Sequence, residues 1–478
     1  MPSLWTLVLL HLALATLLAA DLLLRRKEPL ATLAWLQGLY LLPGVGALLY
    51  VLVGAATIRR RTFRRKRRLA GDFAARLASR GKGPGGVREP PPGLTQTAAE
   101  TLTIAIRTSR LLPTRGNAVE LYDSPSDLYA ALEQAVMGAA RHVHFEYYIF
   151  QPDETGRHFL ELLTRKARQG IEVRLLLDAV GSRSLGTAFT SPFTAAGGQL
   201  AWFLPLGALP PRFALHLRNH RKLAVVDGVV AFTGGVNIGD EYRGRWARKP
   251  SWSDTHLRVE GPAVQQLQEV FAEDWFFAAG QELTDEGYFP PQELRGDAVV
   301  HVVASSPDDP ARAIHATLFH AVASARRSVW IATPYFIPDG AITTALTSSA
   351  QRGVDVRLLL PERTDHPLVD RAGESFLPGL LEAGVRVFRY EAGMLHSKLV
   401  AVDGQWGTLG SANMDIRSFR FNFELNLLVF SPTLCRRLEE IFERDLQHSS
   451  PYTRSHVESA SLPRRVTTAA CRLLAPLL

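Results

Sequence analysis

The sequence predicts an α/β protein with two similar lobes, an active site between them and two transmembrane helices ahead of them. Three observations predict this fold class. Two long apolar runs open the chain, a strand-helix-strand pattern occurs twice in the body, and each copy is followed by the same polar motif. Hydrophobic residues make up 46% and charged residues 21% of the 478 residues, a balance typical of chains with large buried cores.

The N-terminal region contains two apolar runs, at residues 4–24 and 33–53. The first has only His11 and Asp21 as ionisable side chains, and the second has none. About 20 residues cross a bilayer core as a helix, so two transmembrane helices are predicted. A cleaved signal peptide followed by one helix is the alternative, but no basic segment precedes the first run. Pro43 predicts a kink in the second run.

A basic segment follows the second run and completes a membrane anchor at residues 1–68. Residues 59–68 (RRRTFRRKRR) carry eight positive charges and no negative ones. Without them, 46 basic side chains balance 46 acidic ones, so the body is not expected to bind nucleic acid despite the net charge of +8. The more basic flank marks the cytoplasmic side, so the catalytic body is expected there. The same charges can attract anionic lipid head groups.

The region after the anchor is predicted as a linker over residues 69–116, because residues 81–93 (GKGPGGVREPPPG) are rich in Gly and Pro. An internal repeat follows, at residues 147–178 and 334–361. Each copy shows a strand, a turn, an amphipathic helix, a Gly and a buried strand of Val and Leu. Such units predict a mainly parallel or mixed sheet covered by helices. We place lobe one at 117–290, lobe two at 296–450 and a C-terminal tail at 451–478.

Each lobe carries the same polar motif. His220 and His396 are each followed by Lys two residues later, Asp seven later and Asn seventeen later. One such match is a weak signal. A histidine with only a structural role in the core would not be followed by the same residues at the same spacings in both lobes. The motif residues are Lys222, Asp227 and Asn237 in lobe one, and Lys398, Asp403 and Asn413 in lobe two.

The segments around the two histidines (HRKLAVV and HSKLVAV) are predicted as strands that end in an Asp-Gly hairpin turn. Residues two apart on a strand face the same side, so each His should point with its Lys. Asp227 and Asp403 have the opposite parity and lie in the turns. We count them with the catalytic motif, but their place favours fixing the turn over carrying protons.

Paired cations and amide donors suit a phosphodiester, whose oxygens gain charge in the transition state. One neutral imidazole can attack phosphorus, and the other, protonated, can donate to the leaving alkoxide. Each His needs a carboxylate to fix its tautomer. Glu424 is the candidate partner of His396, and Asp254 that of His220. No metal-ligand cluster or nucleotide loop is recognisable, so the scheme requires no cofactor.

The twin HxKxxxxD motifs resemble the phospholipase D superfamily, and their surroundings resemble bacterial cardiolipin synthases. The similar segments are RNHRK, GGVNIGDEY, LHSK, GSANMDIRSFRFNFELN, TLAWL, LLPGVGALLYVLVG and the triplet at residues 365–367. The resemblance implies a multi-pass protein of the bacterial inner membrane, with phosphatidylglycerol and other anionic phospholipids as partners. It also implies phosphatidyl transfer between two phosphatidylglycerol molecules, giving cardiolipin and glycerol. Lobe one has GGxN where lobe two has GSxN, so Ser411 is a donor in one lobe only.

Several alternatives stay open at this point. The same site could serve a hydrolase that releases phosphatidic acid, or a nuclease, although the two spans and the neutral body disfavour a nuclease. Phosphatidylethanolamine could replace one phosphatidylglycerol. A non-enzymatic membrane scaffold is disfavoured because both His-Lys pairs are intact. The asymmetry between the lobes favours His220 as the nucleophile.

Two further segments are candidates for contact with the membrane interface. Residues 185–213 are apolar and rich in Gly and Pro, and residues 462–478 are apolar with three interspersed arginines. The alternatives are a buried packing loop for the first segment and a frayed tail for the second. The functional interpretation is that apolar side chains enter the interface while arginines face phosphates.

Overall fold

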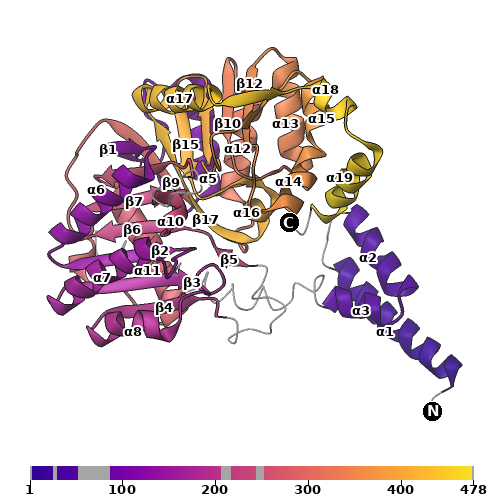
Figure 1. Ribbon diagram of the computed structural model, residues 1–478, viewed down its shortest axis with the longest axis horizontal. Coiled ribbons are helices and arrows are strands. Elements are labelled where there is room, and N and C mark those ends of the chain that lie inside the picture. The colour runs from indigo at the N-terminus through magenta and orange to yellow at the C-terminus, as the bar shows by residue number, and fades with distance from the viewer. Residues whose placement is uncertain are drawn as a thin grey trace.

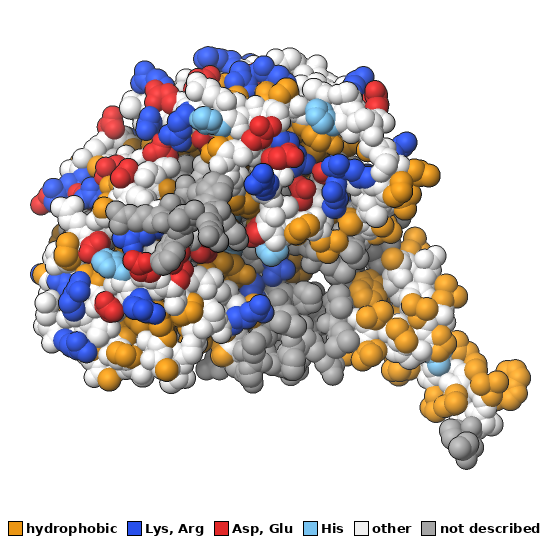
Figure 2. Space-filling view, in the orientation of Figure 1, with side chains coloured by type: hydrophobic (Ala, Val, Ile, Leu, Met, Phe, Trp, Pro, Cys, Tyr) orange, Lys and Arg blue, Asp and Glu red, His pale blue; other side chains and the backbone are white. Residues whose placement is uncertain are grey.

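The computed structural model describes residues 3–24, 29–51, 71, 87–205, 217–243 and 252–475. An N-terminal helical hairpin projects from a mixed α/β body (Figure 1). The exposed side chains of the hairpin are almost all apolar (Figure 2). The hairpin comprises α1 (Leu4–Leu24), α2 (Pro29–Leu41) and α3 (Val45–Leu49).

The first half of the body contains a strand-rich unit with three parallel strands at its outer edge. β2, β3 and β4 are parallel, and the remaining neighbours are antiparallel. Its elements are α5 (Gln96–Thr108), β1 (Thr114–Tyr122), α6 (Pro125–Gly138), β2 (His142–Tyr147), α7 (Glu154–Arg168), β3 (Glu172–Asp178), α8 (Thr187–Ala195), β4 (Gln199–Phe203), β5 (Arg218–Asn219), β6 (Lys222–Val226), β7 (Val230–Gly234), α10 (Asp240–Arg243), β8 (His256–Glu260), α11 (Ala263–Ala279) and the 3-10 helix η2 (Glu286–Tyr288).

The second half repeats this arrangement. β10, β12 and β13 are its parallel strands. Its elements are β9 (Ala298–Ser305), α12 (Ala313–Ser324), β10 (Ser328–Ala332), β11 (Phe336–Ile337), α13 (Gly340–Gln351), β12 (Asp355–Pro361), α14 (Pro367–Glu374), α15 (Leu377–Glu382), β13 (Arg386–Tyr390), β14 (Leu399–Val402), β15 (Trp406–Gly410), β16 (Met414–Asp415), α16 (Ile416–Arg420), β17 (Asn422–Phe430), α17 (Pro432–Leu446), β18 (Ser449–Tyr452), α18 (Arg454–Glu458) and α19 (Leu462–Leu474).

The two halves share one sheet, because β1 pairs with β9 in antiparallel register. The order across the described residues is β18-β13-β12-β10-β14-β15-β17-β9-β1-β8-β7-β6-β2-β3-β4. β5 belongs to the first half but pairs with β17 of the second. The predicted mixed α/β fold with two similar halves is therefore confirmed, and the halves are joined edge to edge.

Alternation along the strands divides the core between the two faces of this sheet. Leu223 and Val225 of β6 face one apolar cluster, whereas Ala224 and Val226 face another. The first cluster continues into the second half through β14, β15 and β17. Helices α11 and α17 both pack against it. On the opposite face each half has a cluster of its own.

Two predicted boundaries are wrong. The second apolar run is not one helix: α2 ends at Leu41 and α3 starts at Val45, so within the described residues only α1 is long and apolar enough to cross a membrane. Pro43 has no N–H for the helix ladder, and Gly44 has a φ of 71°, which ends the helix there. The predicted linker contains α5, whose apolar side packs against α12.

The segment at 185–213 is also not an interfacial loop where the structure describes it. Residues 187–195 form α8 and residues 199–203 form β4 at the sheet edge. Phe203 is fully buried and Trp202 is partly buried against the core. The alternative of buried packing therefore holds for this part. Residues 206–213 lie outside the described residues.

Candidate active site

Both motif aspartates close a hairpin, as their parity predicted. Asp227 lies between β6 and β7 and Asp403 between β14 and β15, with φ angles of 52° and 54°. Asp227 accepts hydrogen bonds from the N–H groups of residues 140–142 at 2.7–2.8 Å. Asp403 accepts from those of residues 326–328 at 2.7–3.1 Å. Both carboxylates therefore lie in the turns and bind backbone N–H groups at the start of the neighbouring strand, which is the arrangement expected of turn-fixing residues.

The two histidines lie just before the strands and not within them. β6 begins at Lys222 and β14 at Leu399, so the strand alternation used for the prediction does not reach His220 or His396. Each Lys nevertheless stays with its His, because its Nζ donates to the backbone carbonyl of that His. The Lys222 contact is 2.6 Å.

The segment before each histidine pairs with a strand or bridge of the other half. The N–H of His220 donates to the Phe423 carbonyl at 2.9 Å, where β5 runs beside β17. The N–H of His396 donates to the Ser253 carbonyl at 2.7 Å. These pairings place each histidine at the boundary between the halves, beside residues of the opposite half.

The carboxylate partners are consequently exchanged relative to the prediction. Nδ1 of His220 donates to Oε2 of Glu424 at 3.1 Å, and Nδ1 of His396 donates to Oδ2 of Asp254 at 2.7 Å. We expected Glu424 with His396 and Asp254 with His220, each within its own lobe. The four residues are the predicted ones, but both pairs cross between the halves. With Nδ1 engaged, Nε2 is the ring nitrogen of each histidine that can meet a substrate.

Burial keeps both imidazoles neutral. It lowers the pKa of His220 to about 4, and it lowers the pKa of His396 well below its usual value with the help of the charges on Lys398 and Lys222. Burial raises the pKa of Asp254 to about 6. Burial also tends to raise the pKa of Glu424, but His220, Lys222 and Ser411 outweigh this effect and bring the pKa below its usual value. Two neutral rings therefore face the site, with Nδ1 of His220 beside Glu424 and Nδ1 of His396 between Asp254 and Nζ of Lys398, which lies 2.9 Å away.

The two lysines form the cationic part of the site. Burial and the charge of Lys398 lower the pKa of Lys222 well below its usual value. Burial lowers the pKa of Lys398 to about 8, against the opposing charges of Asp254 and Glu424. Both lysines are almost completely buried. A phosphate anion between them would offset this mutual repulsion, so the site favours an anionic ligand.

Ser411 supports a carboxylate. Its hydroxyl donates to Oε2 of Glu424 at 2.5 Å and accepts from the N–H of Leu425 at 2.9 Å. The equivalent residue of the first half is Gly235, where an added Cβ would lie 2.0 Å from Oδ1 of Asp254. The difference between GSxN and GGxN therefore reflects how each half holds its carboxylate.

The two motif asparagines also differ. Asn237 uses its side chain within the protein, because Nδ2 donates to the Tyr242 hydroxyl at 2.8 Å and Oδ1 accepts from Ile149 at 3.2 Å. Tyr242 in turn lies 3.4 Å from Nδ1 of His396. Asn413 has a buried Oδ1 without a hydrogen-bond partner among the described residues. Of the two side chains, that of Asn413 is therefore the one left for a ligand, and its Oδ1 can accept a hydrogen bond from a ligand hydroxyl.

Sequence reasoning missed the aromatic side chains that border the histidines. The Tyr148 ring lies edge-on to His220 with centroids 4.9 Å apart, and Tyr335 stands similarly to His396 at 6.4 Å. Burial raises the pKa of both hydroxyls. The signal was present, because Tyr148 and Tyr335 occupy equivalent positions in the repeat (YIFQPD and YFIPDG).

A buried ionic network behind His220 was also missed. Arg221 pairs with Asp274 of α11, and its Nε and Nη2 donate to the carbonyls of Glu424 and Ser305 at 3.2 and 3.1 Å. Asn219 donates to Glu146 at 2.6 Å. Burial, followed by the charge of Asp274, raises the pKa of Glu146 well above its usual value. Arg221 thus ties the strand of Glu424 to the segment of His220.

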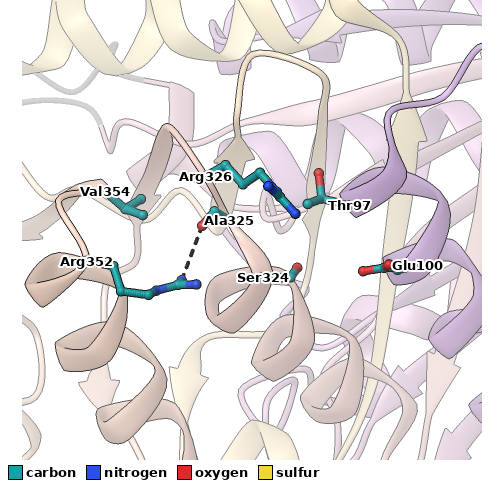
Figure 3. Close-up of a pocket in the computed structure, with 7 residues that line it drawn as sticks. All are labelled: Thr97, Glu100, Ser324, Ala325, Arg326, Arg352 and Val354. Atoms are coloured by element: carbon teal, nitrogen blue, oxygen red, sulfur yellow. Dashed lines mark hydrogen bonds between the residues drawn. The ribbon is translucent and has the colours of Figure 1, made fainter.

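A separate polar pocket of about 490 Å³ lies away from this centre (Figure 3). Arg326 reaches toward Thr97 in it, and Arg352 donates to the Ala325 carbonyl at 3.2 Å. The N–H of Asp403 donates to the carbonyl of Ser328, which lies two residues after Arg326 in the chain. Asp403 is at the turn of the β14–β15 hairpin, the end farther from His396. The pocket therefore opens at the opposite end of that hairpin from the histidines. Its lining residues are Thr97, Glu100, Ser324, Ala325, Arg326, Arg352 and Val354.

Two repeated halves that exchange histidine–carboxylate pairs, with a lysine beside each ring, define a phospholipase D-type protein. The family profile described as "Cardiolipin synthase, PLD-like domain" matches residues 132–275 and 318–446. That described as "Phospholipase_D-nuclease N-terminal" matches residues 13–54. The chain belongs to the bacterial cardiolipin synthase family of this superfamily, as its sequence resemblance implied, and it is an enzyme of that family.

Relatives of similar length support this assignment. "Cardiolipin synthase" of Geobacillus thermodenitrificans is 37% identical over 457 residues, covering 95% of this chain and 90% of that protein. "Cardiolipin synthase 2" of Bacillus cereus is 37% identical over 473 residues, covering 97% and 90%. The crystal structure of phosphatidylserine synthase from Haemophilus influenzae has a TM-score of 0.60 at 14% identity, covering 79% of this chain and all of that one, and shows the likeness of fold.

Proposed function

We propose that this enzyme makes cardiolipin and glycerol from two phosphatidylglycerol molecules, through a phosphohistidine intermediate. The observation that carries the proposal is the pair of neutral imidazoles, each with Nδ1 held by a carboxylate and Nε2 left for substrate, beside two buried lysines. The family and its relatives' names support cardiolipin as the product.

In the first step, Nε2 of His220 attacks phosphorus of one phosphatidylglycerol. A bond from nitrogen to phosphorus forms, and the bond from phosphorus to the glycerol oxygen breaks. Protonated His396 gives its Nε2 proton to that oxygen, and glycerol leaves. The bound phosphate charge raises the pKa of His396 by offsetting the lysine charges that depress it, so the acid becomes available when substrate is present.

In the second step, a head-group hydroxyl of another phosphatidylglycerol attacks the phosphohistidine. His396 accepts the hydroxyl proton, the new phosphorus–oxygen bond forms, and His220 is released with its Nε2 lone pair restored. Lys222, Lys398 and the Asn413 amide stabilise the charge on the phosphoryl oxygens. Since one phosphodiester replaces another, the reaction needs no nucleotide. We assign no cofactor or metal to it.

Product analysis tests the reaction. The full-length enzyme in detergent micelles receives phosphatidylglycerol that carries one label at phosphorus and a second label in the head-group glycerol. Equal amounts of cardiolipin and free glycerol support transfer. Phosphatidic acid as the main lipid product would indicate hydrolysis, and a rate that rises on adding phosphatidylethanolamine, with a matching loss of that lipid, would indicate a mixed acceptor. Peptide mapping after a rapid alkaline quench then tests the nucleophile: phosphorus label on the peptide of His396 would overturn the assignment to His220.

For the membrane anchor we propose that α1 crosses the membrane and that the broken pair α2–α3 returns, with the body on the cytoplasmic side. Tyr50 donates to Asp21 at 2.8 Å, which ties the returning segment to α1. Eight positive charges in residues 59–68 of the sequence favour the cytoplasmic side for the body, which comes after them in the chain. Cysteines introduced into the exposed faces of the body should be protected from an impermeant thiol reagent in intact cells and labelled after permeabilisation.

A further inference from the structure

The C-terminal helix α19 is docked on the body by one side only. Cys471 of α19 and Ala475, which follows the helix, pack into an apolar cluster with Ile337 and with Ala372 of α14. Arg464 donates to Glu374 at 2.9 Å, which holds the start of the helix on α14. The alternative of a frayed tail therefore does not hold, because residues 462–474 form a helix that packs on the body.

The other side of α19 exposes an apolar stripe. Leu462, Val466 and Leu473 are exposed by 71%, 59% and 81%. Their spacings of four and seven residues put them on one face, roughly opposite Cys471 and Ala475. Single exposed leucines are ordinary on protein surfaces. Three in line, on a helix whose packing side is already occupied, form a surface suited to an apolar partner.

Position and charge identify the partner as a lipid surface. The apolar N-terminal hairpin projects from the same edge of the body as α19 in this view (Figure 1), and exposed hydrophobic side chains occur over both (Figure 2). Leu368 of α14, the helix on which α19 packs, is 45% exposed and adds an exposed apolar side chain to this part of the body. Arg465 lies on one flank of the stripe, where its side chain can reach lipid phosphates, whereas Arg472 on the same flank stacks over the Phe376 ring, with its Cζ 5.0 Å from the ring centroid.

We propose that α19 lies along the membrane surface, with Leu462, Val466 and Leu473 inserted at the level of the head groups, and docks the catalytic body on the bilayer that holds its substrate. The helix has 13 residues and a length of about 20 Å, too short to cross a bilayer core of about 30 Å. It therefore lies on the membrane. The inference rests on the proposed lipid reaction only for its kinetic test.

Depth measurement on the full chain tests the docking directly. Cys471→Ser removes the native thiol of α19, and the buried Cys435 remains. A spin label is attached at Val466→Cys, or at Thr467→Cys as the matched position one residue later and about 100° around the helix. In vesicles of phosphatidylglycerol and phosphatidylcholine, the Val466 label should be more accessible to oxygen than to a water-soluble nickel chelate, and the Thr467 label the reverse. Equal access of the chelate to both labels would overturn the proposal.

Dilution with unlabelled chain separates the lipid surface from a second copy of the protein. Spin–spin broadening at position 466 that disappears on dilution would show that another copy covers the stripe, which also overturns the proposal. Because this measurement needs no turnover, a deeply placed label in an enzyme that releases only phosphatidic acid would support the docking and refute the proposed transfer.

The kinetic test uses Val466→Asp with Leu473→Asp, and Thr467→Asp as the control of equal chemistry on the same helix. The double variant should need about ten-fold more lipid surface for half-maximal rate while keeping kcat, since lost interfacial binding is lost ground-state binding. In the Thr467→Asp control, the lipid surface needed for half-maximal rate should stay within about two-fold of the parent value. All three side chains are exposed, so the variants should fold like the parent. Equal melting temperatures would verify this. An unchanged surface requirement in the double variant contradicts the proposal.

Discussion

Nδ1 of His220 lies 3.1 Å from Oε2 of Glu424, although 204 positions separate the two residues and each belongs to a different half of the body. Asp254 and His396 form the reciprocal pair at 2.7 Å. Each half therefore supplies the imidazole of one pair and the carboxylate of the other. Damage to either carboxylate should impair the histidine of the opposite half.

Glu424→Gln should disable His220. The amide keeps the size of the side chain but removes the charge that fixes the Nδ1–H tautomer, so kcat should fall by about 10²–10⁴-fold. Single-turnover assays should show less phosphoenzyme, with lipid binding retained. Glu161→Gln on the exposed side of α7 is the control and should be neutral. Full phosphoenzyme formation in Glu424→Gln would contradict the role given to this pair.

His220→Ala and His396→Ala should each reduce transfer to below a few per cent, because the two rings act in different roles within one site. Mixing the two variants tests whether each chain holds a complete site. Activity should not return, since both pairs form within one chain. Recovery on mixing would show that the site is assembled between chains.

Lys398 should set the alkaline limit of activity. Burial lowers the pKa of its ammonium to about 8, so its charge is present below that pH and is lost above it. The pH profile of kcat/KM should fall with an apparent pKa near 8. Lys398→Arg keeps its charge and should move this limit upward at a lower maximal rate. An unmoved limit in that variant would exclude Lys398 as its cause.

The same pKa shift affects stability in a definite direction. The folded pKa of about 8 lies below the usual 10.5, so between these values the unfolded chain binds more protons at this residue. This residue therefore makes the free energy of unfolding increase as the pH rises through that window. Urea titrations of the parent enzyme and Lys398→Met at pH 8 and pH 10 should show a smaller increase in the variant.

Asp227→Ala should weaken folding more than catalysis. Three backbone N–H groups lose their acceptor, and alanine is disfavoured at the φ of 52°, so a loss of about 2–4 kcal/mol is expected. Asp227→Asn keeps an acceptor and tolerates this φ, so it should lose about half as much. Activity per folded molecule should stay near the parent value in both. A large fall in kcat at full folding would instead make Asp227 a proton carrier.

Gly235→Ser should inactivate the enzyme because its Cβ would lie 2.0 Å from Oδ1 of Asp254, displacing the partner of His396. Ser411→Gly removes a hydrogen-bond donor without a clash, so its loss of kcat should be smaller, about ten-fold. Gly138→Ser, where nothing lies within 4 Å, is the control. The order of activities, Gly138→Ser above Ser411→Gly above Gly235→Ser, can be read from initial rates.

The sequence identified the histidines, lysines and turn aspartates because their spacing is local and occurs twice. Hairpin chemistry also placed Asp227 and Asp403 in turns, since two residues with positive φ are needed at that turn. The positions of Glu424 and Asp254 were found, but their assignment was not. No local pattern shows that β5 runs beside β17 or that Ser253 bridges to Leu395, and these two pairings decide which histidine each carboxylate reaches.

Other errors have the same physical origin. The Gly and Pro content of residues 81–93 suggested a long linker, yet α5 follows at once because its apolar face finds α12 far along the chain. Composition made the second apolar run look like one span, and local chemistry at Pro43 and Gly44 ended the helix. Composition and periodicity describe what a segment can bury, while its contacts depend on distant strands.

The apolar cluster that includes Trp275 of α11 and Phe442 of α17 is continuous through both halves. Heat should therefore melt the two halves together, in a single calorimetric peak whose van't Hoff and calorimetric enthalpies agree. In such a protein, one half cannot stay folded once the other half has unfolded. A cavity made at Trp275 lowers the temperature at which both histidines lose their surroundings, so damage far from the reaction is expressed as loss of the whole enzyme.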